Sequence, residues 1–167
     1  IFYFHGLGGF KERDFKTRVL RHTKGFQERS KNFIVVIPEM PWSRNTSTRR
    51  GRQGRVFNKN NEFSTFVNSV IKVVVTLFEP SLVKRSQCMK QNLCQFNFGN
   101  AILVGHSAGG SAIKSISKSG GLDWLYTGRN VRSVKIIFSD AGYGSWTDTA
   151  WKYFKLKGPE TRTEFIL

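Results

Sequence analysis

Four continuous apolar runs constrain the fold of this chain more than any other feature of its sequence. They cover Ile1 to Phe4, Phe33 to Ile37, Ala101 to Val104, and Val134 to Phe138. A run without polar alternation is typical of a strand buried on both faces, as in parallel sheets. Segments with helical spacing separate the runs. The sequence therefore predicts an α/β fold, an open parallel sheet with helices on both faces.

The helical segments have apolar faces and recognisable ends. Asn61 is expected to cap a helix from Glu62 to Phe78, where apolar residues recur every three or four positions. Another helix follows the third run and is expected to end at Gly120-Gly121. The helix between the first two runs is predicted from Phe15, Val19, His22 and Phe26, which fall near one face.

Length and composition fit a single folded domain over residues 1–167. The chain is long enough for a hydrophobic core, and 39% hydrophobic residues suit a globular protein. No run of about eighteen apolar residues is present, so no transmembrane segment is expected. The net charge of +16 favours association with polyanions. No motif supports nucleic-acid binding as the main role.

Cys88 and Cys94 are the only cysteines. They lie in the segment 79–99, which interrupts the strand and helix pattern and is expected to be an irregular excursion or a small cap. Two cysteines without nearby histidines are too few for a structural zinc site. A disulfide would indicate a secreted or periplasmic protein and two thiols a cytoplasmic one, and the spacing is equally compatible with both.

The stretch ILVGHSAGGSAIKS, from Ile102 to Ser115, places a serine at a strand-to-helix turn. Such a turn needs small neighbours, which Gly105 and Gly109 supply. The turn would raise the Ser107 hydroxyl above the sheet edge, and the following helix would direct N–H groups toward developing negative charge. Ser107 is therefore the candidate nucleophile.

A second glycine-rich segment, HGLGG from His5 to Gly9, follows the first run. HGLGG and GHSAGG resemble the oxyanion loop and the nucleophile elbow of the α/β-hydrolase superfamily. The resemblance implies an oxyanion hole formed by the N–H groups of Leu7 and Ala108. It also implies that the runs are four central strands of a hydrolase sheet, in the spatial order 33–37, 1–4, 101–104, 134–138. An ordinary glycine turn is the alternative interpretation of HGLGG.

The segment FSDAGYG, from Phe138 to Gly144, comes directly after the last run. Asp140 would lie at the carboxyl edge of the sheet, where open α/β sheets place their sites. The segment resembles a D-A-x-Y-G stretch of some bacterial α/β-hydrolases, which implies Asp140 as the acid of a catalytic triad. A turn-forming aspartate is the alternative. Asp123 and Asp148 are weaker candidates because neither directly follows a predicted strand.

No residue of this chain matches the catalytic histidine, which the hydrolase order places after the acid. The three histidines, His5, His22 and His106, all precede Asp140. Two interpretations stay open: a chain cut at both ends, with the histidine beyond Leu167, or a degenerate relative without catalysis. In the first case the 167-residue chain alone is expected to show little turnover because its general base is missing.

The expected function is that of a serine hydrolase cleaving an ester, thioester or amide, a reaction for which no metal or organic cofactor is expected. The alternative is a non-catalytic basic binding module on a hydrolase scaffold. A long basic loop from Trp42 to Asn61 leaves the carboxyl end of a predicted strand, so its arginines should border the site and favour an anionic substrate, small or polymeric. A solvated loop that keeps the protein soluble is the other interpretation. The candidate substrate-binding residues are Arg44, Arg49, Arg50, Arg52 and Arg55.

Overall fold

A computed structural model describes the protein over residues 1–6, 17, 21, 24, 34–38, 40, 56–78, 99–129, 131–141, 145–155 and 163–166. Within these ranges the chain forms a parallel sheet and four α-helices around a hydrophobic core. This arrangement confirms the predicted α/β class.

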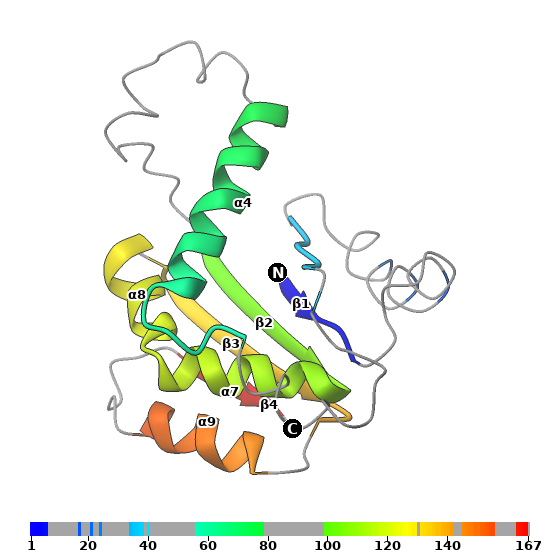
Figure 1. Cartoon of the computed structure of the whole chain (residues 1–167), viewed down its shortest axis with the longest axis vertical. Coiled ribbons are helices and arrows are strands. Elements are labelled where there is room, and N and C mark those ends of the chain that lie inside the picture. Colours follow the sequence, from blue (N-terminus) through cyan, green and yellow to red (C-terminus); the bar gives the residue numbers. More distant parts are fainter. Residues whose placement is uncertain are drawn as a thin grey trace.

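The sheet has four parallel strands in the order β1-β2-β3-β4 (Figure 1). These are β1 (Phe2–Phe4), β2 (Asn100–His106), β3 (Ser133–Ser139) and β4 (Thr163–Ile166). The first three confirm predicted strands. No apolar run predicts β4, because its sequence TEFI is short and begins with two polar residues. Parallel strands bring their carboxyl ends to one edge of the sheet, which is where β1, β2 and β3 lead into the motifs singled out above.

The predicted strand from Phe33 to Ile37 is only partly confirmed. Val36 makes one isolated parallel bridge to Phe2, on the edge of β1 that β2 does not occupy. The N–H of Tyr3 donates to the Val36 carbonyl at 2.9 Å. The Val36 N–H donates to the Ile1 carbonyl at 2.8 Å, and the Ile1 amino group donates to the Ile34 carbonyl at 2.7 Å. Beyond Val36, Pro38 has no N–H with which to continue the ladder. The order of the segments across the sheet is nevertheless the predicted one.

Helix α4 (Glu62–Phe78) has the predicted bounds. Asn61 occupies its N-cap position, where the Asn61 carbonyl accepts the N–H of Thr65 at 2.9 Å. The helix predicted after Ser107 begins as a short 3-10 turn, η3 (Ser107–Gly109), and continues as α7 (Gly110–Lys118).

Two further helices, α8 (Gly121–Arg129) and α9 (Trp146–Lys155), have no counterpart among the predictions. Gly120 ends the α7 region as predicted, with a left-handed φ of 76°, but Gly121 begins α8 instead of a loop. A Cβ built on Gly121 would lie 2.9 Å from side-chain atoms of both Ile116 and Phe63. Glycine is therefore used here for close packing of helices as well as for a stop.

Helices α4, α7, α8 and α9 all contribute buried side chains to one core cluster, and Figure 1 shows α7 alongside β2 and β3, with α8 and the base of α4 near the end where these strands begin. The sheet contributes every second residue of its strands to this cluster, from the face that packs against the helices. From the sheet, it contains Phe2, Phe4, Ala101, Leu103, Val134, Ile136 and Phe138.

The opposite face of the sheet has a smaller cluster, centred on buried Tyr3 and Val104. No residue of the four helices belongs to it. The helix predicted around residues 15–26 lies mostly outside the described residues, although Thr17, Arg21 and Lys24 have helical backbone and exposed side chains. Coverage of both faces by helices therefore stays a prediction.

Candidate active site

Ser107 lies where strand β2 ends and the helical segment begins. Its φ is 51°, in the left-handed region that non-glycine residues seldom adopt. Such a conformation costs about 1–3 kcal/mol and persists only where surrounding packing holds it. The contacts next to this turn therefore decide whether the serine can keep its position.

Three glycines make the Ser107 turn sterically feasible. A Cβ on Gly109 would overlap the Phe4 carbonyl oxygen and lie 2.6 Å from the carbonyl carbon. A Cβ on Gly105 would lie 3.0 Å from the Gly110 nitrogen, and one on Gly110 would lie 2.9 Å from the Ala141 Cβ. The predicted need for small residues at positions 105 and 109 is confirmed. Gly110 adds a further close approach, to the segment that follows β3.

The glycine-rich loop after β1 reaches Ser107 at Gly6. A Cβ on Gly6 would lie 2.8 Å from the Ser107 Cβ and 3.2 Å from its Oγ. The residue before it, His5, is buried, and both of its ring nitrogens contact backbone groups. The Met40 N–H donates to Nε2 at 3.1 Å, and Nδ1 lies 2.8 Å from the Gly6 carbonyl oxygen. The loop predicted to stabilise an oxyanion thus begins directly against the candidate nucleophile.

Ala108 and Leu7 are the predicted oxyanion donors. Ala108 is the buried second residue of η3, and its carbonyl accepts the Ser111 hydroxyl at 2.8 Å. The first N–H groups of a helical segment have no acceptor within it, so the Ala108 N–H is suited to donate to an anion formed beside Ser107. Leu7 lies outside the described residues, and Gly6 is the last described residue of its loop.

Asp140 lies beside the Ser107 turn because β2 and β3 pair residue by residue. His106 pairs with Ser139, so Ser107 and Asp140 are the next residues beyond the paired ends of neighbouring strands. Adjacent strands in a sheet are about 4.8 Å apart. Asp140 is exposed and has a φ of 49°, and Ala141, which follows it, is buried. The structure thus brings the predicted nucleophile and the predicted acid to the same edge.

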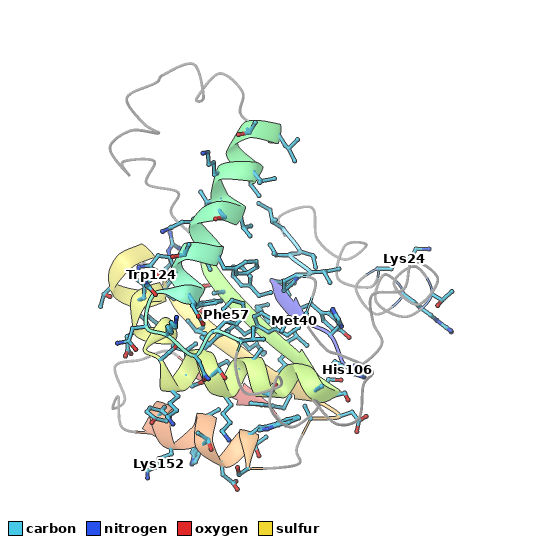
Figure 2. The ribbon with its side chains drawn as sticks, in the orientation of Figure 1. Lys24, Met40, Phe57, His106, Trp124 and Lys152 are labelled. Atoms are coloured by element: carbon cyan, nitrogen blue, oxygen red, sulfur yellow. The ribbon has the colours of Figure 1, made fainter. Side chains whose placement is uncertain are left out.

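The other histidines and aspartates have different surroundings. The His106 ring stacks on the ring of Tyr3, with centroids 6.5 Å apart, and Figure 2 shows His106 at the carboxyl end of β2. Burial raises the pKa of the Tyr3 hydroxyl above its usual value. His22 lies outside the described residues. Asp123 and Asp148 occupy the first turns of α8 and α9, where a carboxylate favourably meets the helix dipole.

The five candidate arginines of the basic loop lie outside the described residues, as do both cysteines. The residues that flank these arginines are described. Met40, before them, is buried and bonded to His5, and Phe57, after them, is buried with its ring centroid 5.8 Å from that of Phe4 (Figure 2). Both flanks of the arginine segment therefore contact the carboxyl end of β1.

Sequence reasoning missed the contribution of α9 to this region. A Cβ on Gly110 would lie 2.9 Å from Trp146 Cε3, so the first residue of α9 packs against the first residue of α7. The i, i+4, i+7 spacing of Trp146, Ala150 and Tyr153 is a helical pattern that could have identified α9.

Among the described residues, no group of three or more His, Cys, Asp or Glu side chains could hold a metal ion. In the same part of the chain, no helix has the length and apolar character needed to cross a membrane.

Comparison with family models, with curated proteins and with solved structures gave no match for this chain. Its function is therefore inferred from the geometry around Ser107.

Proposed function

We propose that this protein is a serine hydrolase of the α/β-hydrolase type, with Ser107 as its nucleophile. The observation that carries the proposal is the positive φ of Ser107 at the junction of a buried parallel strand and a helix. A serine in such a sharp turn presents its hydroxyl at the carboxyl edge of the sheet, as a hydrolase nucleophile must. The order of residues 34–38, β1, β2 and β3 across the sheet supports the same assignment.

In the proposed reaction, Ser107 Oγ attacks the carbonyl carbon of an ester, thioester or amide. A base takes the hydroxyl proton while the new O–C bond forms and the carbonyl electrons move to oxygen. The Ala108 N–H and the N–H that follows Gly6 donate to this oxyanion. Collapse of the intermediate expels the leaving group, which takes up the proton, and water then releases the acyl group by the same steps.

Asp140 is proposed to orient the histidine that serves as the base. An aspartate in this role holds the imidazole in the correct tautomer and stabilises the imidazolium that forms. Its support is its position, next to Ser107 in the register of β2 and β3. His5 is unsuited to be the base because both of its ring nitrogens are engaged with backbone groups.

The proposed substrate is anionic, either a small molecule or a polymer. The support is that Met40 and Phe57, which lie before and after the arginine segment, contact the carboxyl end of β1, beside the serine turn. Arginine binds carboxylates and phosphates through a planar fork of donors.

The proposed nucleophile is tested by labelling the full-length protein with a fluorophosphonate, which reacts with activated serines. We expect one labelled serine, identified as Ser107 by mass spectrometry, and loss of both label and ester turnover in Ser107→Ala. Ser117→Ala is the matched control, because this buried serine bonds to Ile113 in the middle of α7, away from the turn. Full turnover in Ser107→Ala would contradict the mechanism. A wild-type protein that takes up no label would favour the binding module instead.

A further inference from the structure

The backbone at Asp140 has the same unusual conformation as the backbone at Ser107. The φ angle is 49° at Asp140 and 51° at Ser107, and such conformations persist only where the surrounding structure holds them. The Asp140 side chain is exposed, whereas Ala141, the next residue, is 1% exposed and belongs to the main core. The packing of Ala141 therefore holds the turn that carries Asp140.

Ala141 packs against Gly110, the first residue of α7. A Cβ built on Gly110 would lie 2.9 Å from the Ala141 Cβ and 3.3 Å from the Ala141 carbonyl oxygen. The same Cβ would lie 2.9 Å from Trp146 Cε3, at the start of α9, which runs alongside α7 in Figure 1. These three residues form one close-packed group, called the Gly110 contact below.

Two links then fix Asp140 relative to Ser107. The first is the strand register, in which His106 pairs with Ser139, and it ends where β2 and β3 end. The second is the Gly110 contact, which joins the residue after Asp140 to the helix that begins after Ser107. Only the second link lies beyond the strand ends, where the two turns leave the sheet.

We propose that Ala141 is a positioning residue for the reaction, because its contact with Gly110 sets the distance between the Asp140 turn and Ser107. This inference rests on the proposed function, in which Asp140 orients the base. Ala141 acts through the backbone and does not contact the substrate. Glycine is required at position 110 because a methyl group there would occupy the place of the Ala141 side chain.

The variant Gly110→Ala in the full-length protein tests this role. The backbone of Gly110, with φ −59° and ψ −29°, suits alanine, so the added methyl group acts through its contacts alone. Ordinary contact begins at 3.4 Å and alanine has no rotamer to change, so the main chain at Ala141 must retreat by about 0.5 Å or more. A misplacement of about 1 Å can cost about 10²-fold in rate. We expect kcat for a neutral ester to fall by about 10- to 100-fold, with KM little changed.

Gly121→Ala is the matched control, at the other end of α7. A Cβ on Gly121 would lie 2.9 Å from side-chain atoms of both Ile116 and Phe63 and 3.3 Å from the Ile116 carbonyl oxygen, which is the same degree of crowding. Both variants should lower the midpoint of urea unfolding, but only Gly110→Ala should lower kcat per folded molecule, with the folded fraction taken from circular dichroism. Equal kcat per folded molecule in the two variants would overturn the proposal.

Two double variants show whether the loss passes through Asp140. Added to Asp140→Asn, Gly110→Ala should lower kcat by about 2-fold at most, because no carboxylate is left to displace. Gly110→Ala combined with Ala141→Gly moves one methyl group across the contact and should recover most of kcat. The same factor of loss with and without Asp140, or no recovery in the second double variant, would overturn the proposal.

Ala141→Gly alone keeps the inference testable if Gly110→Ala does not fold, because it adds no atom. Loosening the turn should lower kcat by about 10-fold, and an unchanged kcat would overturn the inference. A wild-type protein without any turnover would overturn the hydrolase proposal and this inference together. An active wild type whose kcat is insensitive to these variants would overturn this inference alone.

Discussion

Replacing Gly109 with alanine should force the turn that holds Ser107 away from Phe4, the last residue of β1. The new methyl group would overlap the Phe4 carbonyl oxygen and lie 2.6 Å from the carbonyl carbon, although real Cβ atoms essentially never approach another atom within 3.0 Å. The obstacle is main chain, so no change of rotamer can relieve it. Overpacking of a core costs about 1–3 kcal/mol when side chains can shift. We therefore expect Gly109→Ala to lower the free energy of unfolding by about 3 kcal/mol or more.

Urea unfolding followed by tryptophan fluorescence and far-ultraviolet circular dichroism measures this loss. With a slope of about 2 kcal/mol per molar urea, the midpoint should fall by about 1.5 M. Gly99→Ala is the matched control, because a Cβ built on Gly99, just before β2, has no atom within 4 Å. Its free energy of unfolding should stay within about 1 kcal/mol of the wild-type value. Equal midpoints and slopes for the two variants would refute the steric argument.

Two further predictions concern the chemistry of the site. Asp140→Asn should lower kcat for ester hydrolysis by about 10⁴-fold with a nearly unchanged thermal midpoint, because asparagine tolerates the φ of 49° but does not stabilise an imidazolium; an equal loss in the control Asp148→Asn would contradict this role. Joint replacement of Arg49, Arg50 and Arg52 by Gln should raise KM for an anionic ester and weaken its salt dependence, leaving a neutral ester unaffected. Equal kinetics on both esters would exclude charge selection by these arginines.

The centre of the sheet could be predicted from sequence, and its margins could not. Strands β1, β2 and β3 are mostly apolar because one face lies in the main core and the other carries the smaller cluster around Tyr3 and Val104, and that pattern is visible without knowing any partner. Residues 34–38 are almost as apolar as these strands, but they make a single bridge, from Val36 to Phe2. How far they pair depends on the neighbouring strand β1, which is short. In β4 only two residues are apolar, and its identity as a strand depends on pairing with β3.

The same division holds at the candidate site. Ser107 could be predicted because a tight turn demands small residues within two positions, a local requirement. Asp140 could be predicted because parallel strands share an edge. The hydrogen bond from the Met40 N–H to His5 Nε2 joins residues 35 positions apart, and no local pattern encodes a contact at that separation. Long-range polar contacts of this kind appear only once the tertiary structure is known.

The three residues of β1 have consequences for the order of folding. Phe2 pairs with Leu103 on one side and Val36 on the other, whereas β2, α7, α8 and β3 follow one another along the chain. Distant pairs must overcome the entropy of closing a long loop, so we expect the β2–β3 unit to form first and β1 to dock afterwards. Until then the aromatic Phe2-Tyr3-Phe4 segment stays exposed on a growing chain. The nascent protein should therefore need chaperone protection most at β1, and the turn at Ser107 should reach its final geometry only when Phe4 closes on Gly109.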